Sequence, residues 1–222
     1  MNIIATILLL TSFVATHRSV CDKVRDFFDS HEFIETTLND KLGRQGYYKA
    51  IAIVAPEVSW YSSISDKAET YTLKVLYAQT GKGDFSIGYF QMKPSFAEQI
   101  ENIINTTESL KKKYSDLIII EDTPQAIRAE RVSRLSSLNY ATLYLAAFYE
   151  IAKNRISKWS SNKEGQIQIL KNMATIYNGG LNISESKAME LQGKKQFPSM
   201  ASDKYNYSDL VVDFYNFLTK QN

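Results

Sequence analysis

Apolar residues recur three and four positions apart along most of this chain of 222 residues, and turn-forming residues are scarce. The pattern is strongest over residues 137–153, where Leu138, Ala141, Leu145 and Phe148 share one helix face. The chain contains nine glycines and four prolines, which is too few for a turn-rich β-sandwich. The sequence therefore predicts an all-α fold.

Composition indicates one packed domain and excludes one class of partner. Hydrophobic residues make up 44% of the chain and charged residues 23%, which is typical of a protein with a core and not of a disordered chain. The length suits a single domain with a small appendage. A net charge of +2 provides no basic field for nucleic acid. We expect a monomer that does not bind nucleic acid.

The spacing of apolar residues predicts roughly eight helices around an irregular loop at 81–93. A helix from residue 47 meets Pro56, so it either bends there or a new helix begins with proline at its first position. Residues 34–46 are polar and contain two glycines, and we interpret them as a connection; residues 117–120 could form a short strand. The other predicted helices cover 23–33, 66–80, a stretch from Pro94 through Ile104, 124–135 with Thr123 as N-cap, 137–153, 164–177 and 208–218.

The first residues are typical of an exported protein. Residues 3–15 are apolar apart from Thr and Ser, and this run is too short to span a bilayer comfortably. We interpret residues 1–17 as a signal peptide, 18–46 as an N-terminal helical extension and 47–222 as the main domain. The alternative for the apolar run is a buried N-terminal helix. Cys21 follows it where a lipidated cysteine would stand, but Arg18-Ser19-Val20 fits a lipidation signal poorly, which favours an incidental cysteine.

Three short segments could carry chemistry. Glu57 lies in Ile-Val-Ala-Pro-Glu-Val-Ser-Trp-Tyr, where apolar neighbours would raise its pKa and suit it to act as a general acid. Gly88-Tyr89-Phe90-Gln91-Met92 joins a permissive glycine to aromatic residues and an amide that can bind sugar hydroxyls. Tyr177 precedes a glycine turn and could point into a cleft. Each segment alone has an ordinary structural interpretation: a solvent-facing Glu, a loop with buried aromatics and a helix cap.

Together and in this order, these segments resemble the soluble lytic transglycosylases of the lysozyme superfamily. That family has a catalytic Glu with a Ser close behind it, here Glu57 and Ser59. It then has a Gly-Leu-Met-Gln loop leading to a Pro, here residues 88–94, and an Asn followed by Tyr-Leu, here Asn139 and Tyr144-Leu145. Its last motif, Ala-Tyr-Asn-Ala-Gly, is relaxed here to residues 176–180. The stretch from Glu57 to Gln91 is longer than in the family, and the loop reads Gly-Tyr-Phe-Gln.

The resemblance implies a lysozyme-like domain with extra N- and C-terminal helices that cleaves peptidoglycan between N-acetylmuramic acid and N-acetylglucosamine. Glu57 would protonate the glycosidic oxygen and then act as base for the muramoyl C6 hydroxyl, which gives 1,6-anhydro products. Tyr177 would hydrogen-bond or orient Glu57. The substrate-binding residues it implies are Ser59, Tyr89, Gln91, Tyr177 and Asn178. It implies no cofactor or metal, and the glycan strand is the expected partner, with peripheral association at the cell envelope or periplasm left open.

Two other functions stay open on the same fold. A lysozyme-type hydrolase would use water and a second acid, for which Asp66, Glu69 and Asp84 are the candidates. Asp66 and Glu69 are three residues apart and so share a helix face, although a solvated helix face is the favoured interpretation of this pair. A non-catalytic glycan-binding envelope protein would have no need of Glu57.

Overall fold

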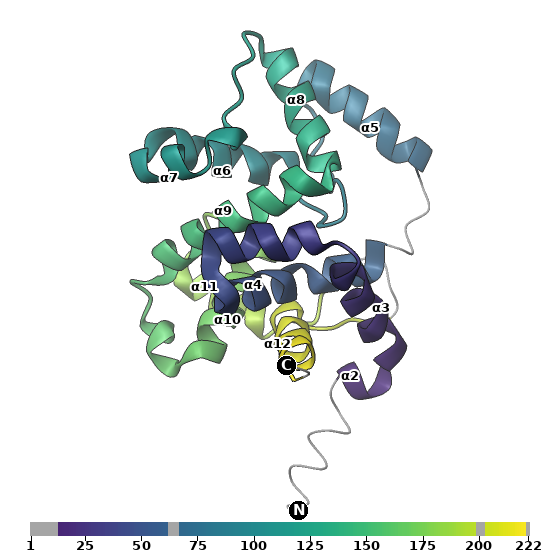
Figure 1. Cartoon of the computed structure of the whole chain (residues 1–222), viewed down its shortest axis with the longest axis vertical. Helices are drawn as coiled ribbons and strands as arrows, with labels where there is room; N and C mark the ends of the chain where they lie inside the picture. Colours follow the sequence, from purple (N-terminus) through teal and green to yellow (C-terminus); the bar gives the residue numbers. More distant parts are fainter. Residues whose placement is uncertain (1–12, 62–66, 199–202, 221–222) are drawn as a thin grey trace, which may run out of the picture.

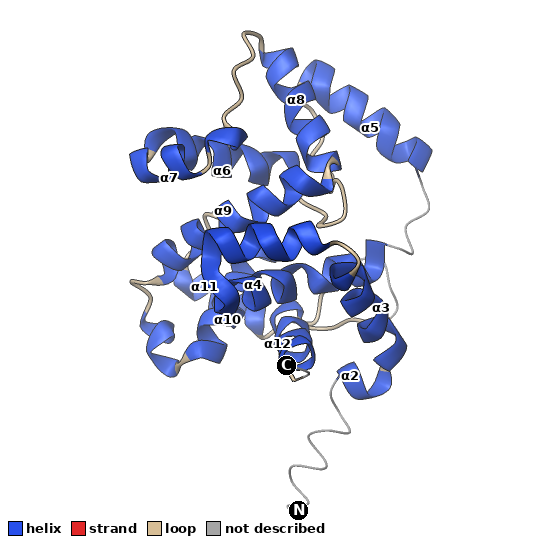
Figure 2. Cartoon of the chain, in the orientation of Figure 1, coloured by secondary structure: helices blue, strands red, loops and turns tan. Residues whose placement is uncertain are grey.

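The structure, a computed structural model, describes residues 13–61, 67–198 and 203–220, and for residues 61 and 67–71 it describes the backbone alone. Within these ranges the regular structure is helical (Figure 2). Extended pairing in the same ranges is limited to two isolated bridges, Ile87 with Met92 and Phe197 with Tyr205. The predicted all-α class is confirmed.

The described helices follow one another along the chain, with the longest connections before α6 and before α12. The α-helices are α2 (Phe13–Thr16), α3 (Arg18–Asp29), α4 (Glu32–Tyr61), α5 (Lys67–Thr80), α6 (Pro94–Thr106), α7 (Glu108–Lys113), α8 (Pro124–Ser136), α9 (Leu138–Ile156), α10 (Gln166–Gly179), α11 (Glu185–Gln192) and α12 (Tyr207–Thr219). Two 3-10 turns, Ser115–Leu117 and Ser160–Glu164, complete the described helical structure.

Helices with a strong apolar stripe were predicted to within a few residues. The predictions for α5, α8, α9, α10 and α12 are confirmed, and the Thr123 hydroxyl accepts from the Ala126 amide as the expected N-cap of α8. Pro94 begins α6 because its missing N–H leaves no bond unmade at a first helical position. Helix α4 is continuous through Pro56, so the second of the two alternatives for that residue is wrong.

Two expectations about connecting segments are wrong. Residues 34–46 are helical, because Ile34 and Leu38 are one turn apart and both buried while their polar neighbours face outward. The helix breaks only at Gly43, whose φ of 72° and ψ of 168° lie outside the helical region. Residues 117–120 form no strand: Leu117 ends a 3-10 turn and is buried, whereas Ile120 is exposed.

Helix α4 lies at the centre of the molecule. It packs against α3, α9, α10 and α12, and its second half carries an unbroken buried run from Ala50 to Ala55. Figure 1 shows α5, α6, α7 and α8 grouped in the upper part of the view and α2, α3 and α12 in the lower part, with α9 between them. The helix that bears Glu57 is thus fixed on several sides, which is what a positioned catalytic group requires.

The N-terminal helices pack on the same core. Val24, Phe28 and Leu38 belong to the same buried cluster as core residues of the predicted main domain, which begins at residue 47. Helix α4 runs across this predicted boundary without a linker. Phe13 is buried too: its ring stacks on His17 with centroids 4.3 Å apart, and its amide donates to Asp213 at 3.0 Å. These contacts fall within the predicted signal peptide, whose residues 1–12 lie outside the described residues. In the described ranges, no helix combines the length and the apolar character that crossing a bilayer demands.

Candidate active site

Glu57 is a carboxyl group held in largely apolar surroundings. It is partly exposed, while its neighbours Ala55 and Val58 on α4 are buried. Burial raises its pKa to about 8, and a hydrogen bond with Tyr207 opposes part of that rise. A carboxyl with such a pKa carries its proton at neutral pH, which is the state that a general acid needs.

Glu57 opens into a cleft of about 220 Å³ that is built from four parts of the chain. Helix α4 supplies Glu57, the loop before α6 and α6 itself supply the opposite wall, and the end of α10 supplies the third side. The polar side chains that line the cleft are those of Glu57, Asp84, Ser86, Gln91, Lys93, Ser95, Gln99, Tyr177 and Asn178. Such a set offers both donors and acceptors, as recognition of sugar hydroxyls requires.

The loop that bears Gln91 is a tight hairpin. The amides and carbonyls of Ile87 and Met92 exchange hydrogen bonds of 3.0 and 3.1 Å across it. Gly88 has a φ of 72°, and a Cβ at this position would lie 2.1 Å from the carbonyl oxygen of Leu135. Only glycine allows the loop to lie this close to the end of α8.

Gln91 is held in an unusual backbone conformation at the cleft. Its φ of 49° is in the left-handed region, which non-glycine residues seldom adopt and which is found most often at functional sites. Its side-chain amide donates to the carbonyl of Gly88 at 2.8 Å, so the turn itself fixes its rotamer. Gln91 therefore presents a preorganised polar group beside Glu57.

Tyr177 has a different partner from the one expected. We predicted that it would hydrogen-bond or orient Glu57, but its buried hydroxyl donates to the carbonyl of Phe90 at 2.6 Å. This bond ties the hairpin to α10. Tyr177 still lines the cleft, and its pKa is raised well above the usual value by burial and then by the nearby charge of Glu57.

The tyrosine that contacts the carboxyl group is Tyr207, which the sequence analysis did not identify. Its hydroxyl donates to the carbonyl of Ile53 at 2.9 Å and also forms a hydrogen bond with Glu57. Burial raises its pKa well above the usual value, so it stays a donor. Tyr207 is the first residue of α12 and directly follows Asn206, the N-cap of that helix. A capping Asn followed by a Tyr is the only local sign in the sequence that this hydroxyl is held in place.

Ser59 and Tyr89, both predicted to bind substrate, do not line this cleft. They line a separate, mainly apolar cavity of about 360 Å³ together with Val24 and Phe27 of α3 and Val58 of α4. The Ser59 hydroxyl donates to the carbonyl of Pro56 at 2.6 Å, within its own helix. The structure thus brings together Glu57, Gln91, Tyr177 and Asn178, and places Ser59 and Tyr89 in a neighbouring hollow.

One candidate for a second acid lies in the cleft. Asp84 lines it, forms a salt bridge with Lys93 at 3.6 Å and accepts from the amide of Ser95 at 3.4 Å. Asp66 lies outside the described residues, and the side chain of Glu69 does too. The cleft also contains Ser95 and Gln99, four residues apart on α6, which the sequence analysis left unassigned.

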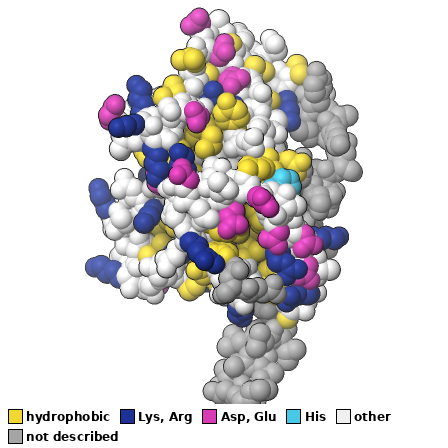
Figure 3. All heavy atoms as spheres, viewed as in Figure 1, with side chains coloured by type: hydrophobic (Ala, Val, Ile, Leu, Met, Phe, Trp, Pro, Cys, Tyr) yellow, Lys and Arg dark blue, Asp and Glu magenta, His cyan; other side chains and the backbone are white. Residues whose placement is uncertain are grey.

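The described residues form no cluster of metal-ligating side chains, and charges of both signs are mixed on one face of the molecule. Within the described ranges, no group of three or more His, Cys, Asp or Glu side chains could hold a metal ion. Acidic and basic side chains intermingle on the face shown in Figure 3, with hydrophobic side chains between them. Comparison of the chain with protein families, with curated proteins and with solved structures finds no match.

Proposed function

We propose that this chain is a peptidoglycan lytic transglycosylase that cleaves the bond between N-acetylmuramic acid and N-acetylglucosamine. The observation that carries the proposal is a carboxyl group, Glu57, with a pKa raised to about 8 at the wall of a polar cleft. Protonated Glu57 donates to the glycosidic oxygen as the bond breaks. The resulting carboxylate then accepts the proton of the muramoyl C6 hydroxyl, which closes the 1,6-anhydro ring.

The residues around Glu57 support this sequence of steps. Tyr207 can donate to the carboxylate once the proton has left, so the charge formed after the first step meets a fixed donor. Gln91 and Asn178 line the same cleft and offer amides to sugar hydroxyl and acetamido groups. No second acid is needed for an intramolecular attack by the C6 hydroxyl.

A lysozyme-type hydrolase is the second candidate, and one observation favours it. Asp84 lines the same cleft as Glu57 and could position water or stabilise the developing positive charge. Its salt bridge with Lys93 and its bond from Ser95 occupy it in part, and we therefore place the transglycosylase first.

We further propose that the protein acts after export, in the periplasm or cell envelope where peptidoglycan is located. The apolar run at residues 3–15 supports export. Cys21 is fully buried in α3 and burial raises the pKa of its thiol to about 11, which fits an incidental cysteine better than a lipid attachment point.

The Glu57→Gln variant tests the assignment of the acid. Glutamine keeps the shape and hydrogen bonds of the side chain but cannot act as an acid, so we expect the release of soluble fragments from purified peptidoglycan to fall by about a hundredfold or more. Glu121→Gln, which changes an exposed loop carboxylate in the same way, should retain full activity. Equal activity of Glu57→Gln and the native chain would remove Glu57 from the mechanism.

A further inference from the structure

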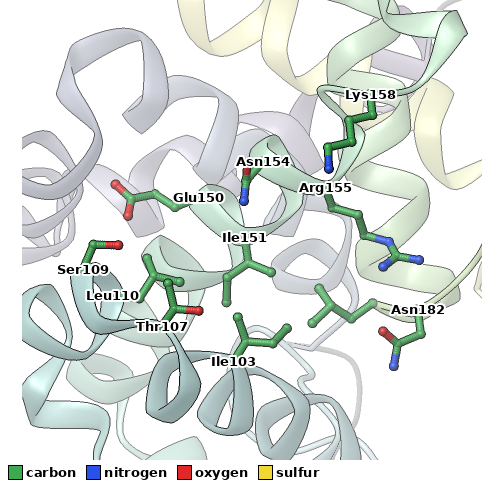
Figure 4. A pocket seen from close by; sticks show the side chains of 11 residues that line it. Ile103, Thr107, Ser109, Leu110, Glu150, Ile151, Asn154, Arg155, Lys158 and Asn182 are labelled. Atoms are coloured by element: carbon green, nitrogen blue, oxygen red, sulfur yellow. The ribbon is translucent and has the colours of Figure 1, made fainter.

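A second and larger hollow, the α6–α9 cavity, has a volume of about 610 Å³. Its walls include Ile103 from α6, Thr107 from the junction between α6 and α7, Ile151 and Arg155 from α9, and Leu181 and Asn182 from the segment that follows α10. Figure 4 shows the labelled side chains around one space. The volume is within the range of small-ligand sites, and none of the roles assigned to the catalytic cleft uses it.

The α6–α9 cavity lies next to the catalytic cleft along α6. Ser95 and Gln99 line the cleft and Ile103 lines the cavity, and residues four apart on a helix lie on one face. On the opposite side, residues 177–180 line the cleft and residues 181–182 line the cavity. At their boundary the Asn182 amide, which lines the cavity, donates to Gln99, which lines the cleft, at 2.9 Å. We call these two neighbouring hollows the groove along α6, and from Ser95 to Ile103 they follow about 12 Å of the helix.

The two ends of the cavity differ in charge. Arg155 and Lys158 lie on one side in Figure 4 and Glu150 on the other. Glu150 forms a salt bridge with Lys113 and is thereby neutralised. Among the described residues, Arg155 and Lys158 form no salt bridge, and Arg155 directs one N–H to the carbonyl of Ile183 at 3.0 Å. The net charge at this end of the cavity is therefore positive.

The floor between the charged ends is apolar. Ile151 and Leu181 are buried and Ile103 is partly buried, so a ligand would meet hydrocarbon below it and cations at one end. Where a stem peptide is attached, the lactyl carboxylate of the sugar chain is converted to an amide, so the glycan itself offers neither hydrocarbon side chains nor free carboxylates. A short peptide with small apolar side chains and free carboxylates has both.

We propose that the α6–α9 cavity binds the stem peptide of the peptidoglycan strand whose sugars occupy the catalytic cleft, with Arg155 and Lys158 facing a carboxylate of that peptide. The inference rests on the proposed function, because it takes peptidoglycan as the ligand. It adds that the protein recognises the peptide as well as the glycan, and that residues 155 and 158 determine this preference.

The experiment measures binding, so that it does not depend on cleavage. Soluble peptidoglycan strands with stem peptides are titrated into the full-length Glu57→Gln protein, before and after the peptide carboxylates are converted to amides. Amidation should weaken binding by about tenfold, because it removes the negative charge that Arg155 and Lys158 would face. Lys158→Gln alone should lose about threefold on the free-acid strands, and Arg155→Gln with Lys158→Gln should bind both strands equally.

Lys163→Gln is the matched control, because Lys163 is exposed and is not among the residues that line the groove. It should show the same loss on amidation as the Glu57→Gln parent. If amidation weakens binding equally in the parent and in the doubly substituted protein, or in neither, the inference is wrong.

The two proposals fail separately. A native chain that releases no fragments from peptidoglycan, while the parent and the double variant still differ in their response to amidation, loses the proposed activity and keeps the peptide site. A native chain that cleaves peptidoglycan while that difference is absent keeps the activity and loses the peptide site.

Discussion

Burial of Glu57 raises its pKa, and the contact with Tyr207 opposes part of that rise and so adjusts how the site responds to pH. The Tyr207 hydroxyl has one proton and two acceptors, the Ile53 carbonyl and the Glu57 carboxylate. While Glu57 is protonated, its carboxyl group can donate a hydrogen bond to the Tyr207 oxygen, and the Tyr207 hydroxyl can donate to the carbonyl of Ile53. When Glu57 ionises, Tyr207 becomes a donor to the carboxylate and stabilises the charge.

Removing the Tyr207 hydroxyl should therefore raise the pKa of Glu57 above about 8, because the hydrogen bond that lowers it is lost. The proposed activity requires protonated Glu57, so the alkaline limb of the pH–rate profile should move to higher pH in Tyr207→Phe. Tyr215→Phe, on the same helix, should leave that limb in place. A Tyr207→Phe profile that overlays the native one would show that Tyr207 does not act on the carboxyl group.

How far individual residues could be predicted depended on local sequence. The apolar neighbours of Glu57 are adjacent in the chain, so its raised pKa was expected from sequence. Tyr207 is 150 positions away and reaches Glu57 only because α12 packs on α4, a contact that no local pattern encodes. The same limit explains why Tyr177 was given the role that Tyr207 has.

Among the helices, a buried ionic network joins α5, α6, α8 and α9. The Arg131 guanidinium donates to the Glu101 carboxylate at 2.7 Å and to the Tyr77 hydroxyl at 2.7 Å, and the Tyr144 hydroxyl donates to Glu101 at 2.6 Å. All four residues are buried. Periodicity placed these helices correctly, but polar residues at buried positions carry no periodic signal, and this network was not foreseen.

Arg131→Met should destabilise the protein by about 3–5 kcal/mol, because it leaves the Glu101 carboxylate buried without its partner. Thermal or urea unfolding measures the loss. Glu101→Gln together with Arg131→Met removes both charges and should recover part of the stability. Glu190→Gln, at an exposed pair of lysines, is the control and should change little. Arg131→Met unfolding at the native midpoint would mean that the network contributes no stability.

For the whole molecule, the raised pKa of Glu57 makes folding sensitive to pH. Its pKa rises from an ordinary 4.5 to about 8, so the folded state holds a proton that the unfolded state releases. This group therefore destabilises the fold progressively as pH rises from 4.5 to 8 and has no effect below 4.5. The carboxylates with lowered pKa, Glu185 and Glu190 at about 2, act instead below pH 4.5 and outside this window.

Glu57→Gln has no such titration and should match the native chain in stability at pH 4. At pH 8.5 it should be more stable than the native chain by up to about 5 kcal/mol, given about 1.4 kcal/mol for each pKa unit between 4.5 and 8. Urea unfolding at both pH values checks this, with Glu121→Gln as the control. A constant difference between Glu57→Gln and the native chain across the range would contradict a raised pKa.

The fold as a whole was more predictable than its site. Scarce glycine and proline and long apolar stripes determine the all-α class and most helix bounds, because both signals are local. The cleft and the groove along α6 arise where α4, α6, α10 and the hairpin at residues 87–92 meet, and that meeting depends on contacts between distant segments. The order of motifs predicted that Glu57, Gln91 and Tyr177 lie at one site, and the structure places them in one cleft. The same motifs also assigned Ser59 and Tyr89 to that site, but these two residues line another cavity.

The measurement that decides the proposed chemistry is mass spectrometry of the fragments released from purified peptidoglycan by the native chain and by Glu57→Gln. A transglycosylase that uses Glu57 as acid and then base should release 1,6-anhydromuropeptides, and the variant should release about a hundredfold less or none that can be detected. Fragments with free reducing ends would contradict the intramolecular attack and turn attention to Asp84. The absence of fragments from the native chain would contradict the activity itself.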